Sequence, residues 1–114
     1  MSFLSTIFKS KSVDSDKIEI LDTKAYKNAV IGKDVQLVDV RTQREFRSGH
    51  IGKARNIDFF KGGEFFKAFE DFDKQKPLYL YCRSGNRSQK AARKLVSLGF
   101  EKIYDLKGGI LRWE

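Results

Sequence analysis

The chain has 114 residues, of which 40% are hydrophobic and 33% are charged. That length suits a single domain, and the hydrophobic content excludes an intrinsically disordered chain. Because Cys82 is the only cysteine and His50 the only histidine, an internal disulfide and a structural zinc site are excluded. The 23 lysines and arginines outnumber the 15 aspartates and glutamates, and the net charge of +8 favours binding of an anion.

The N-terminus carries a short apolar stretch over residues 3–8. No basic residue precedes it and no small-residue cleavage site follows it, so it is not typical of a signal peptide. Nowhere do about 18 apolar residues run together, as a transmembrane helix requires. We expect a cytoplasmic protein with no membrane partner, with an N-terminal extension over residues 1–15 and one domain over residues 16–114. The alternative for residues 3–8 is an amphipathic turn that touches a membrane or a partner.

The first part of the chain predicts two strand and helix pairs. The apolar residues at 18–21 predict a strand, and Asp22 or Thr23 can cap the helix that follows it. Four apolar residues share one face of that helix: Ala25, Tyr26, Ala29 and Val30. The β-branched run at 35–40 predicts a second strand. A capping box then predicts a short helix over residues 43–47.

A third strand is predicted at residues 55–58, followed by a helix over residues 64–72. Phenylalanines spaced about one turn apart give that helix an apolar face: Phe65, Phe66, Phe69 and Phe72. We expect this face, together with Trp113, to lie in the core. Residues 78–81 then predict a fourth strand, bounded by a proline.

The last part of the chain predicts a helix over residues 88–98 with Gly99 as its end. Its inward side chains are expected to be Ala91, Ala92, Leu95 and Leu98. A final strand at residues 102–106 ends at a pair of glycines, before a helical turn over residues 110–114. This alternation predicts an α/β fold, with a mainly parallel central sheet of about five short strands and helices on both faces.

Cys82 stands where chemistry is expected in such a fold. In open α/β sheets, ligands bind beyond the carboxyl ends of the strands, where loops lead into helix N-termini. Cys82 directly follows a predicted strand and precedes a glycine-containing loop. Backbone amides of that loop and of the next helix converge on the sulfur, which favours a thiolate and a bound anion. Arg83 and Arg87 add fixed positive charge that suits a sulfate-like or phosphate-like group.

Two interpretations of Cys82 have to be weighed at this point. A free cysteine after an apolar strand is often a small packing residue, but packing does not require two arginines and a glycine in the next five residues. Cysteine phosphatases enclose phosphate with a loop of seven residues from cysteine to arginine. Here the arginine stands at position 87, so the loop has six residues and is one residue too short for the phosphatase pattern.

Four separated motifs make the chain resemble the single-domain rhodaneses, a family of thiosulfate sulfurtransferases. The motifs are VDVR at 38–41 with Glu45-Phe46, GHI at 49–51 leading to Asn56-Ile57, YCRSGNRS at 81–88, and GGI at 108–110 ending in Trp113. The resemblance covers nearly the whole chain after residue 17. The chain departs from the family pattern at residues 52–53, where the family often has a proline or a later glycine.

The resemblance implies a rhodanese-like fold and a ping-pong sulfur transfer that uses no cofactor and no metal. Cys82 attacks the outer sulfur of thiosulfate or a similar donor, sulfite leaves, and a persulfide remains on the cysteine. Cyanide, a thiol or a protein then accepts the sulfur. Arg87 is expected to contact the anion and Arg83 to attract the donor at the rim. The expected substrate-binding residues are Arg83, Ser84, Gly85, Asn86, Arg87 and Ser88.

Three residues outside the loop are weaker candidates. His50 invites a Cys–His pairing as in thiol hydrolases, but the resemblance places it in a structural turn. Asp39 and Arg41 lie at the carboxyl end of a predicted strand, where they either support the site or form a buried ion pair, and we favour the ion pair.

The basic helix after the loop has three possible uses. Three basic residues share one face of this helix: Lys90, Arg93 and Lys94. The first interpretation is a solvated helix face, and the second is a surface that attracts anionic donors. No nucleic acid partner is expected, because no recognised motif accompanies the charge. We therefore predict a sulfurtransferase; the rivals are phosphatase or arsenate-reductase chemistry in the same loop, and a non-catalytic binding module.

Overall fold

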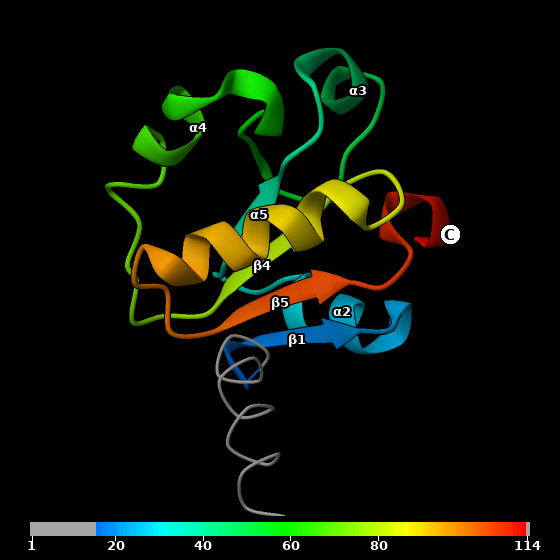
Figure 1. Cartoon of the computed structure of the whole chain (residues 1–114). Coiled ribbons are helices and arrows are strands. Elements are labelled where there is room, and N and C mark those ends of the chain that lie inside the picture. Colours follow the sequence, from blue (N-terminus) through cyan, green and yellow to red (C-terminus); the bar gives the residue numbers. More distant parts are fainter. Residues whose placement is uncertain (1–15, 114) are drawn as a thin grey trace, which may run out of the picture.

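A computed structural model describes residues 16–113 of the chain (Figure 1). Its sheet is parallel throughout, in the order β1-β5-β4-β2-β3. The strands are β1 (Ile18–Leu21), β2 (Gln36–Asp39), β3 (Arg55–Asn56), β4 (Leu78–Tyr81) and β5 (Ile103–Leu106). The prediction of about five short strands in a mainly parallel sheet is confirmed, with most strands one or two residues shorter than expected.

Helices cover both faces of the sheet, as predicted (Figure 1). The α-helices are α2 (Thr23–Val30), α3 (Gln43–Arg47), α4 (Gly63–Lys67) and α5 (Asn86–Ser97). Two 3₁₀ turns, η1 (Phe59–Lys61) and η2 (Gly109–Arg112), follow β3 and β5. Helices α4 and α5 lie on one face and α2 lies on the other, so β4 is covered on both sides (Figure 1).

The sheet separates two hydrophobic cores. The core beneath α4 and α5 includes Val38, Leu80, Phe65, Phe69, Phe72, Leu95, Phe100 and Ile103. The core beneath α2 includes Tyr26, Val30, Leu37, Ile51, Tyr81 and Leu106, with Trp113 packed against it. Both buried phenols have partners: the Tyr26 hydroxyl donates to the Leu80 carbonyl at 2.9 Å, and the Tyr81 hydroxyl accepts from the Ile51 amide at 2.9 Å. The strands that carry the site are therefore packed on both faces, and the buried hydroxyls between them are satisfied.

The predicted helix N-termini are formed by the expected side chains. Asp22 accepts a hydrogen bond from the Ala25 amide at 2.8 Å and begins α2. Thr42 and Glu45 form the complete capping box that begins α3. Because α3 follows β2 directly, this cap also fixes the chain beside the carboxyl end of that strand.

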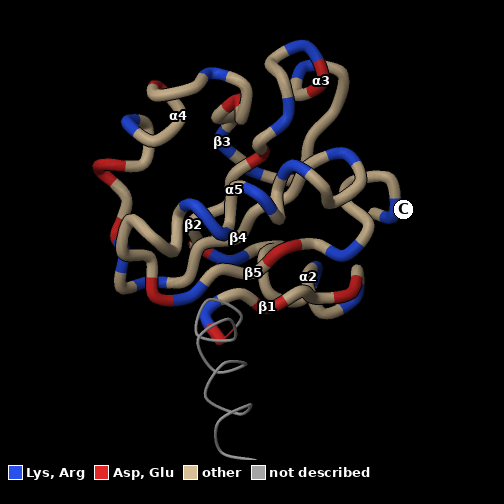
Figure 2. The backbone as a smooth tube through the Cα atoms, viewed as in Figure 1, with Lys and Arg blue, Asp and Glu red and all other residues tan. Residues whose placement is uncertain are grey.

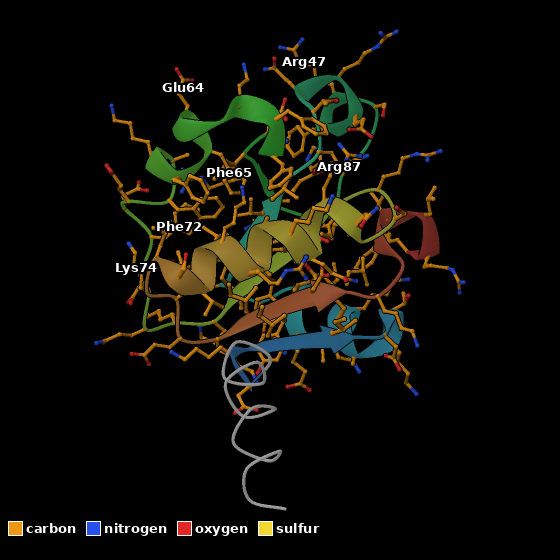
Figure 3. All side chains as sticks on the ribbon, viewed as in Figure 1. Arg47, Glu64, Phe65, Phe72, Lys74 and Arg87 are labelled. Carbon is orange, nitrogen blue, oxygen red and sulfur yellow. The ribbon has the colours of Figure 1, made fainter. Side chains whose placement is uncertain are left out.

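Helix α4 is shorter than the predicted helix over residues 64–72, since it ends at Lys67. Beyond it the amides of Phe69 and Phe72 each bond to the carbonyl three residues earlier, at 3.0 Å and 3.1 Å. That three-residue spacing keeps the phenylalanines on one face. Phe65, Phe69 and Phe72 are buried as predicted, Phe66 is half-buried, and Phe65 and Phe72 point toward α5 (Figure 3).

The prediction that Leu98 points inward is wrong, because its side chain is 44% exposed. Helix α5 ends one residue earlier, at Ser97, and Leu98 lies in the turn that leads to Gly99. The Phe100 amide bonds back to the Leu95 carbonyl at 3.3 Å, and Phe100 is fully buried. Phe100 therefore occupies the core at this end of the helix in place of Leu98.

Among the helices of residues 16–113, none combines the length and the apolar character needed to cross a membrane. The expectations for the apolar segment at residues 3–8 lie outside the described residues.

Candidate active site

The Cys82 sulfur lies directly beyond the carboxyl end of β4, in the middle of the sheet. The residue is only 1% exposed. Its Sγ atom accepts hydrogen bonds from the backbone amides of Gly85 at 3.0 Å and Ser88 at 3.4 Å. The predicted convergence of loop amides on the sulfur is therefore present, and it is made by two amides of the loop. Such an arrangement stabilises negative charge on sulfur.

Gly85 gives the loop its shape. Its φ of 106° lies in the region that residues with a Cβ rarely adopt, and it stands immediately before α5. Helix α5 begins at Asn86, two residues earlier than predicted, so Arg87 and Ser88 belong to its first turn. The Ser88 amide of this turn donates to the sulfur, and the positive end of the helix dipole lies there.

The η2 turn supports the same loop from behind. The Ile110 amide donates to the Cys82 carbonyl at 2.9 Å, and the Leu111 amide donates to the Arg83 carbonyl at 3.2 Å. Gly109 packs against the loop so closely that a Cβ there would lie 2.6 Å from the Ser84 nitrogen. The double glycine was interpreted from sequence only as the end of a strand. Its role in letting η2 approach the loop was missed.

Arg87 is held by an acidic partner at the mouth of the site. Its two terminal nitrogens contact the two carboxylate oxygens of Glu45 at 2.9 Å and 3.0 Å. The hydrogen bonds from Arg87 lower the pKa of Glu45 to about 2, and those from Thr42 contribute. The sequence identified Glu45 only as a capping-box residue. The contact between Glu45 and Arg87 joins residues 42 positions apart in the sequence. Helical spacing predicts only contacts within one helix, so it could not reveal this one.

Asp39 and Arg41 form a buried ion pair beside the site. The Arg41 Nε and Nη2 atoms contact the Asp39 carboxylate at 2.7–3.0 Å, and Nη2 also donates to the Gly49 carbonyl at 2.6 Å. The Asn56 side chain donates to the backbone carbonyls of Asp39 and Arg41 at 3.0 Å and 2.9 Å. These contacts join the end of β2 to the turn after α3 and to β3. Within residues 16–113 neither side chain hydrogen-bonds to Cys82.

His50 is exposed and stacks on Phe46, with ring centroids 3.9 Å apart. Its Nδ1 atom lies 3.2 Å from the Phe46 carbonyl oxygen. Over the described part of the chain, no hydrogen bond joins His50 to Cys82, so the geometry does not resemble a Cys–His pair. In that same part, no cluster of three or more His, Cys, Asp or Glu side chains is placed to hold a metal ion.

Asp105 is a buried carboxyl that the sequence did not single out. It lies in β5 with no exposed surface, and neither carboxyl oxygen has a hydrogen-bond partner among residues 16–113. Burial raises its pKa to about 7, although the nearby Ser88 hydroxyl opposes the shift. That hydroxyl is directed to the Gly85 carbonyl at 3.2 Å, while the Ser88 amide faces the Cys82 sulfur. A titratable group therefore lies directly beneath the loop.

The chain matches a known protein family. The model of the rhodanese-like domain family matches residues 22–114. The sequence is 41% identical over 81 residues to the uncharacterized protein YqhL of Bacillus subtilis, which covers 71% of this chain and 62% of that protein. It is 37% identical over 82 residues to the thiosulfate sulfurtransferase GlpE of Coxiella burnetii, covering 72% of this chain and 74% of that enzyme.

Solved structures show the same fold. A rhodanese-like domain protein from Staphylococcus aureus superposes with a TM-score of 0.73 at 30% identity, over 84% of this chain and 91% of that one. A rhodanese-related protein from Thermoplasma volcanium superposes with a TM-score of 0.71 at 26% identity, over 83% and 89% of the two chains.

Proposed function

Because the chain belongs to the rhodanese-like domain family, we propose that it is a thiosulfate sulfurtransferase that carries sulfane sulfur as a persulfide on Cys82. One observation carries the proposal: the Cys82 sulfur is enclosed by its loop and accepts hydrogen bonds from the amides of Gly85 and Ser88. Amides aimed at one sulfur suit a group that is anionic both before and after it gains a second sulfur atom.

The first half of the reaction loads the cysteine. The Cys82 thiol loses its proton to solvent, and the thiolate attacks the outer sulfur of thiosulfate. A new sulfur–sulfur bond forms on Cys82, the sulfur–sulfur bond of thiosulfate breaks, and its electron pair leaves with sulfite. In the second half a thiolate acceptor or cyanide attacks the outer sulfur of the persulfide, and the Cys82 thiolate is regenerated. No net oxidant or reductant is consumed.

Different groups of the loop bind the cysteine sulfur and the anionic donor. The amides between Arg83 and Ser88 receive the charge of the thiolate and then of the persulfide. The Arg87 guanidinium, oriented by Glu45, contacts the sulfonate oxygens of the donor through its remaining N–H groups. Arg83 is exposed at the rim, where its charge raises the local concentration of an anionic donor. Asp39 and Arg41 act only by fixing the neighbouring turn.

The test is a mass measurement on the intact protein. Incubation with thiosulfate should add 32 Da, as about one sulfur atom per chain, and cyanide should remove it. Because Cys82 is the only cysteine, the adduct reports on that residue alone. Cys82→Ser should stay unmodified and keep the melting temperature of the parent. A chain that gains no sulfur from thiosulfate or from inorganic polysulfide would contradict the proposal and leave a binding module or anion hydrolysis.

A further inference from the structure

The edge of the sheet that holds Cys82 carries a concentration of exposed positive charge. In a parallel sheet all carboxyl ends lie at one edge, so the segments after β2, β3, β4 and β5 meet around the cysteine. Six exposed basic side chains of these segments form what we call the basic rim: Arg44, Arg47, Lys61, Arg83, Lys90 and Arg112. Among residues 16–113 none of these six is in an ion pair. Figure 2 shows this positive charge along α3 and toward the C-terminal turn.

Two of the acidic side chains near these basic residues are already engaged. Glu45 is bound by both terminal nitrogens of Arg87. Asp58 accepts a hydrogen bond from the Phe60 amide at 2.9 Å and begins the η1 turn. One exposed carboxylate, Glu64 of α4, lies near Lys61 without an ion pair among residues 16–113. Six exposed basic side chains outweigh it, so the basic rim keeps a net positive charge that is available to an anionic partner.

Two exposed apolar side chains flank the loop within the basic rim. Phe60 is 66% exposed, and the Arg87 guanidinium carbon lies 5.5 Å from its ring centroid. Leu111 is 58% exposed, and its amide is bonded to the Arg83 carbonyl. Since η1 follows β3 and η2 follows β5, on opposite sides of β4, the two side chains lie on opposite sides of the Cys82 loop. A small anionic donor or a free thiol needs neither of them.

A shallow hollow of about 300 Å³ lies beside Lys61, at the end of η1. Its apolar lining residues are Ile57, Phe65 and Ala68, and its charged lining residues are Asp58, Lys61 and Glu64. It is large enough to take one apolar side chain of a partner.

We propose that the basic rim, Phe60 and Leu111 together dock an acidic protein surface that presents the acceptor cysteine. The sulfur on Cys82 is almost fully buried, so the acceptor thiol has to enter on a projecting segment while the surface around it rests on the rim. Positive charge with aliphatic contact suits carboxylates and apolar side chains of a protein, whereas Leu111 offers neither charge nor stacking to a nucleic acid. The acceptor role rests on the proposed sulfur transfer, but the docking itself does not.

The test compares two peptide acceptors with the persulfide-loaded protein. Both have one cysteine and one leucine in the same positions, and one is rich in Asp and Glu while the other is rich in Lys. Peptide mass gain of 32 Da is followed in time. We expect transfer to the acidic peptide to be at least about tenfold faster at low ionic strength, and this advantage to shrink with added salt.

Variants identify the surface. Arg47→Glu combined with Lys61→Glu should remove most of the tenfold preference, and Leu111→Ser should slow transfer to the acidic peptide severalfold. The matched control reverses two exposed lysines at the opposite edge of the sheet, Lys33→Glu with Lys76→Glu, and should keep the preference. All these variants should transfer sulfur to 2-mercaptoethanol, an uncharged small thiol, at the parental rate.

Binding is measured separately, so that the two proposals can fail independently. The acidic peptide with serine in place of cysteine is titrated with unloaded protein by fluorescence anisotropy, which requires no persulfide. Equal affinity for the acidic and basic peptides, or loss of binding in the control variant as well, would overturn the docking surface. Tighter binding of a single-stranded RNA of equal charge, lost in the Arg47 and Lys61 double variant, would also overturn it. Acidic-peptide binding without any sulfur loading would instead overturn the proposed function.

Discussion

The Arg87 guanidinium contacts both carboxylate oxygens of Glu45, at 2.9 Å and 3.0 Å, and so ties the first turn of α5 to the first turn of α3. Glu45 also closes the capping box with Thr42. One carboxylate therefore orients both a helix and the arginine beside the buried sulfur. The positions of Arg87 and α3 should depend on each other, because removal of either partner leaves a partly buried charge unpaired.

Glu45→Gln should destabilise the protein in a pH-dependent way. The folded state lowers the pKa of Glu45 from 4.5 to about 2, so the contribution of this carboxylate is fully present above about pH 5 and is lost as the pH falls toward 2. We expect a loss of about 2 kcal/mol at pH 7, after allowance for solvent screening. Urea unfolding at several pH values checks this. Glu64→Gln, on an exposed α4 carboxylate, is the matched control and should change little.

Arg87→Ala should raise the KM for thiosulfate by about tenfold, because one charge-assisted contact to the donor is lost. Arg83→Ala should have a smaller effect that disappears at high salt, since Arg83 acts from the exposed rim. Steady-state formation of thiocyanate from cyanide measures both. If Arg87→Ala lowers stability as much as Glu45→Gln does but leaves KM unchanged, then Arg87 is a structural residue and does not contact the donor.

Most of the fold could be predicted because local signals and tertiary structure agree along the chain. The capping box at Thr42 and Glu45 predicted α3 with its observed bounds. The errors in the predicted helix ends and core residues occur where tertiary contacts, and not local sequence, determine the structure. Leu98 has the helical spacing of a core residue, but α5 stops at Ser97, and the buried Phe100 lies beyond the helix, where periodicity has no meaning.

The loop around Cys82 could also be predicted, since its glycine, its arginines and the following helix are contiguous in sequence. Contacts that join distant segments could not. The pairing of Arg87 with Glu45 and the packing of Gly109 on Ser84 depend on how strands far apart in sequence become neighbours. Asp105 was missed for a different reason. An acidic residue in an alternating strand normally faces solvent, so the sequence gives no sign that this carboxyl is buried.

Gly109→Ala should impair both stability and sulfur loading. The φ of 67° already disfavours alanine, and the new Cβ would meet the backbone of the cysteine loop at Ser84. Gly32→Ala is the matched control, because Gly32 has a similar φ of 72° and no atom within 4 Å of the added Cβ. We expect each variant to lose about 1 kcal/mol from backbone strain. Only Gly109→Ala should lose more than that and load sulfur at least about tenfold more slowly in the mass assay. Equal loading rates in the two variants would show that η2 does not position the loop.

Asp105→Asn should stabilise the protein at neutral and alkaline pH. The folded state raises the pKa of Asp105 from 3.8 to about 7 because the carboxyl is buried, so the folded chain holds a proton that the unfolded chain has released. Stability is therefore highest below about pH 4 and falls as the pH rises to about 7, beyond which this contribution is constant. The cost of the buried carboxylate is at most about 4 kcal/mol, and the asparagine variant does not carry it. Thermal unfolding should be measured from pH 4 to 9. The stability of the variant relative to the parent should increase up to about pH 7 and stay constant above it. A difference that does not change with pH would mean that Asp105 stays ionised throughout, with a partner that offsets its burial.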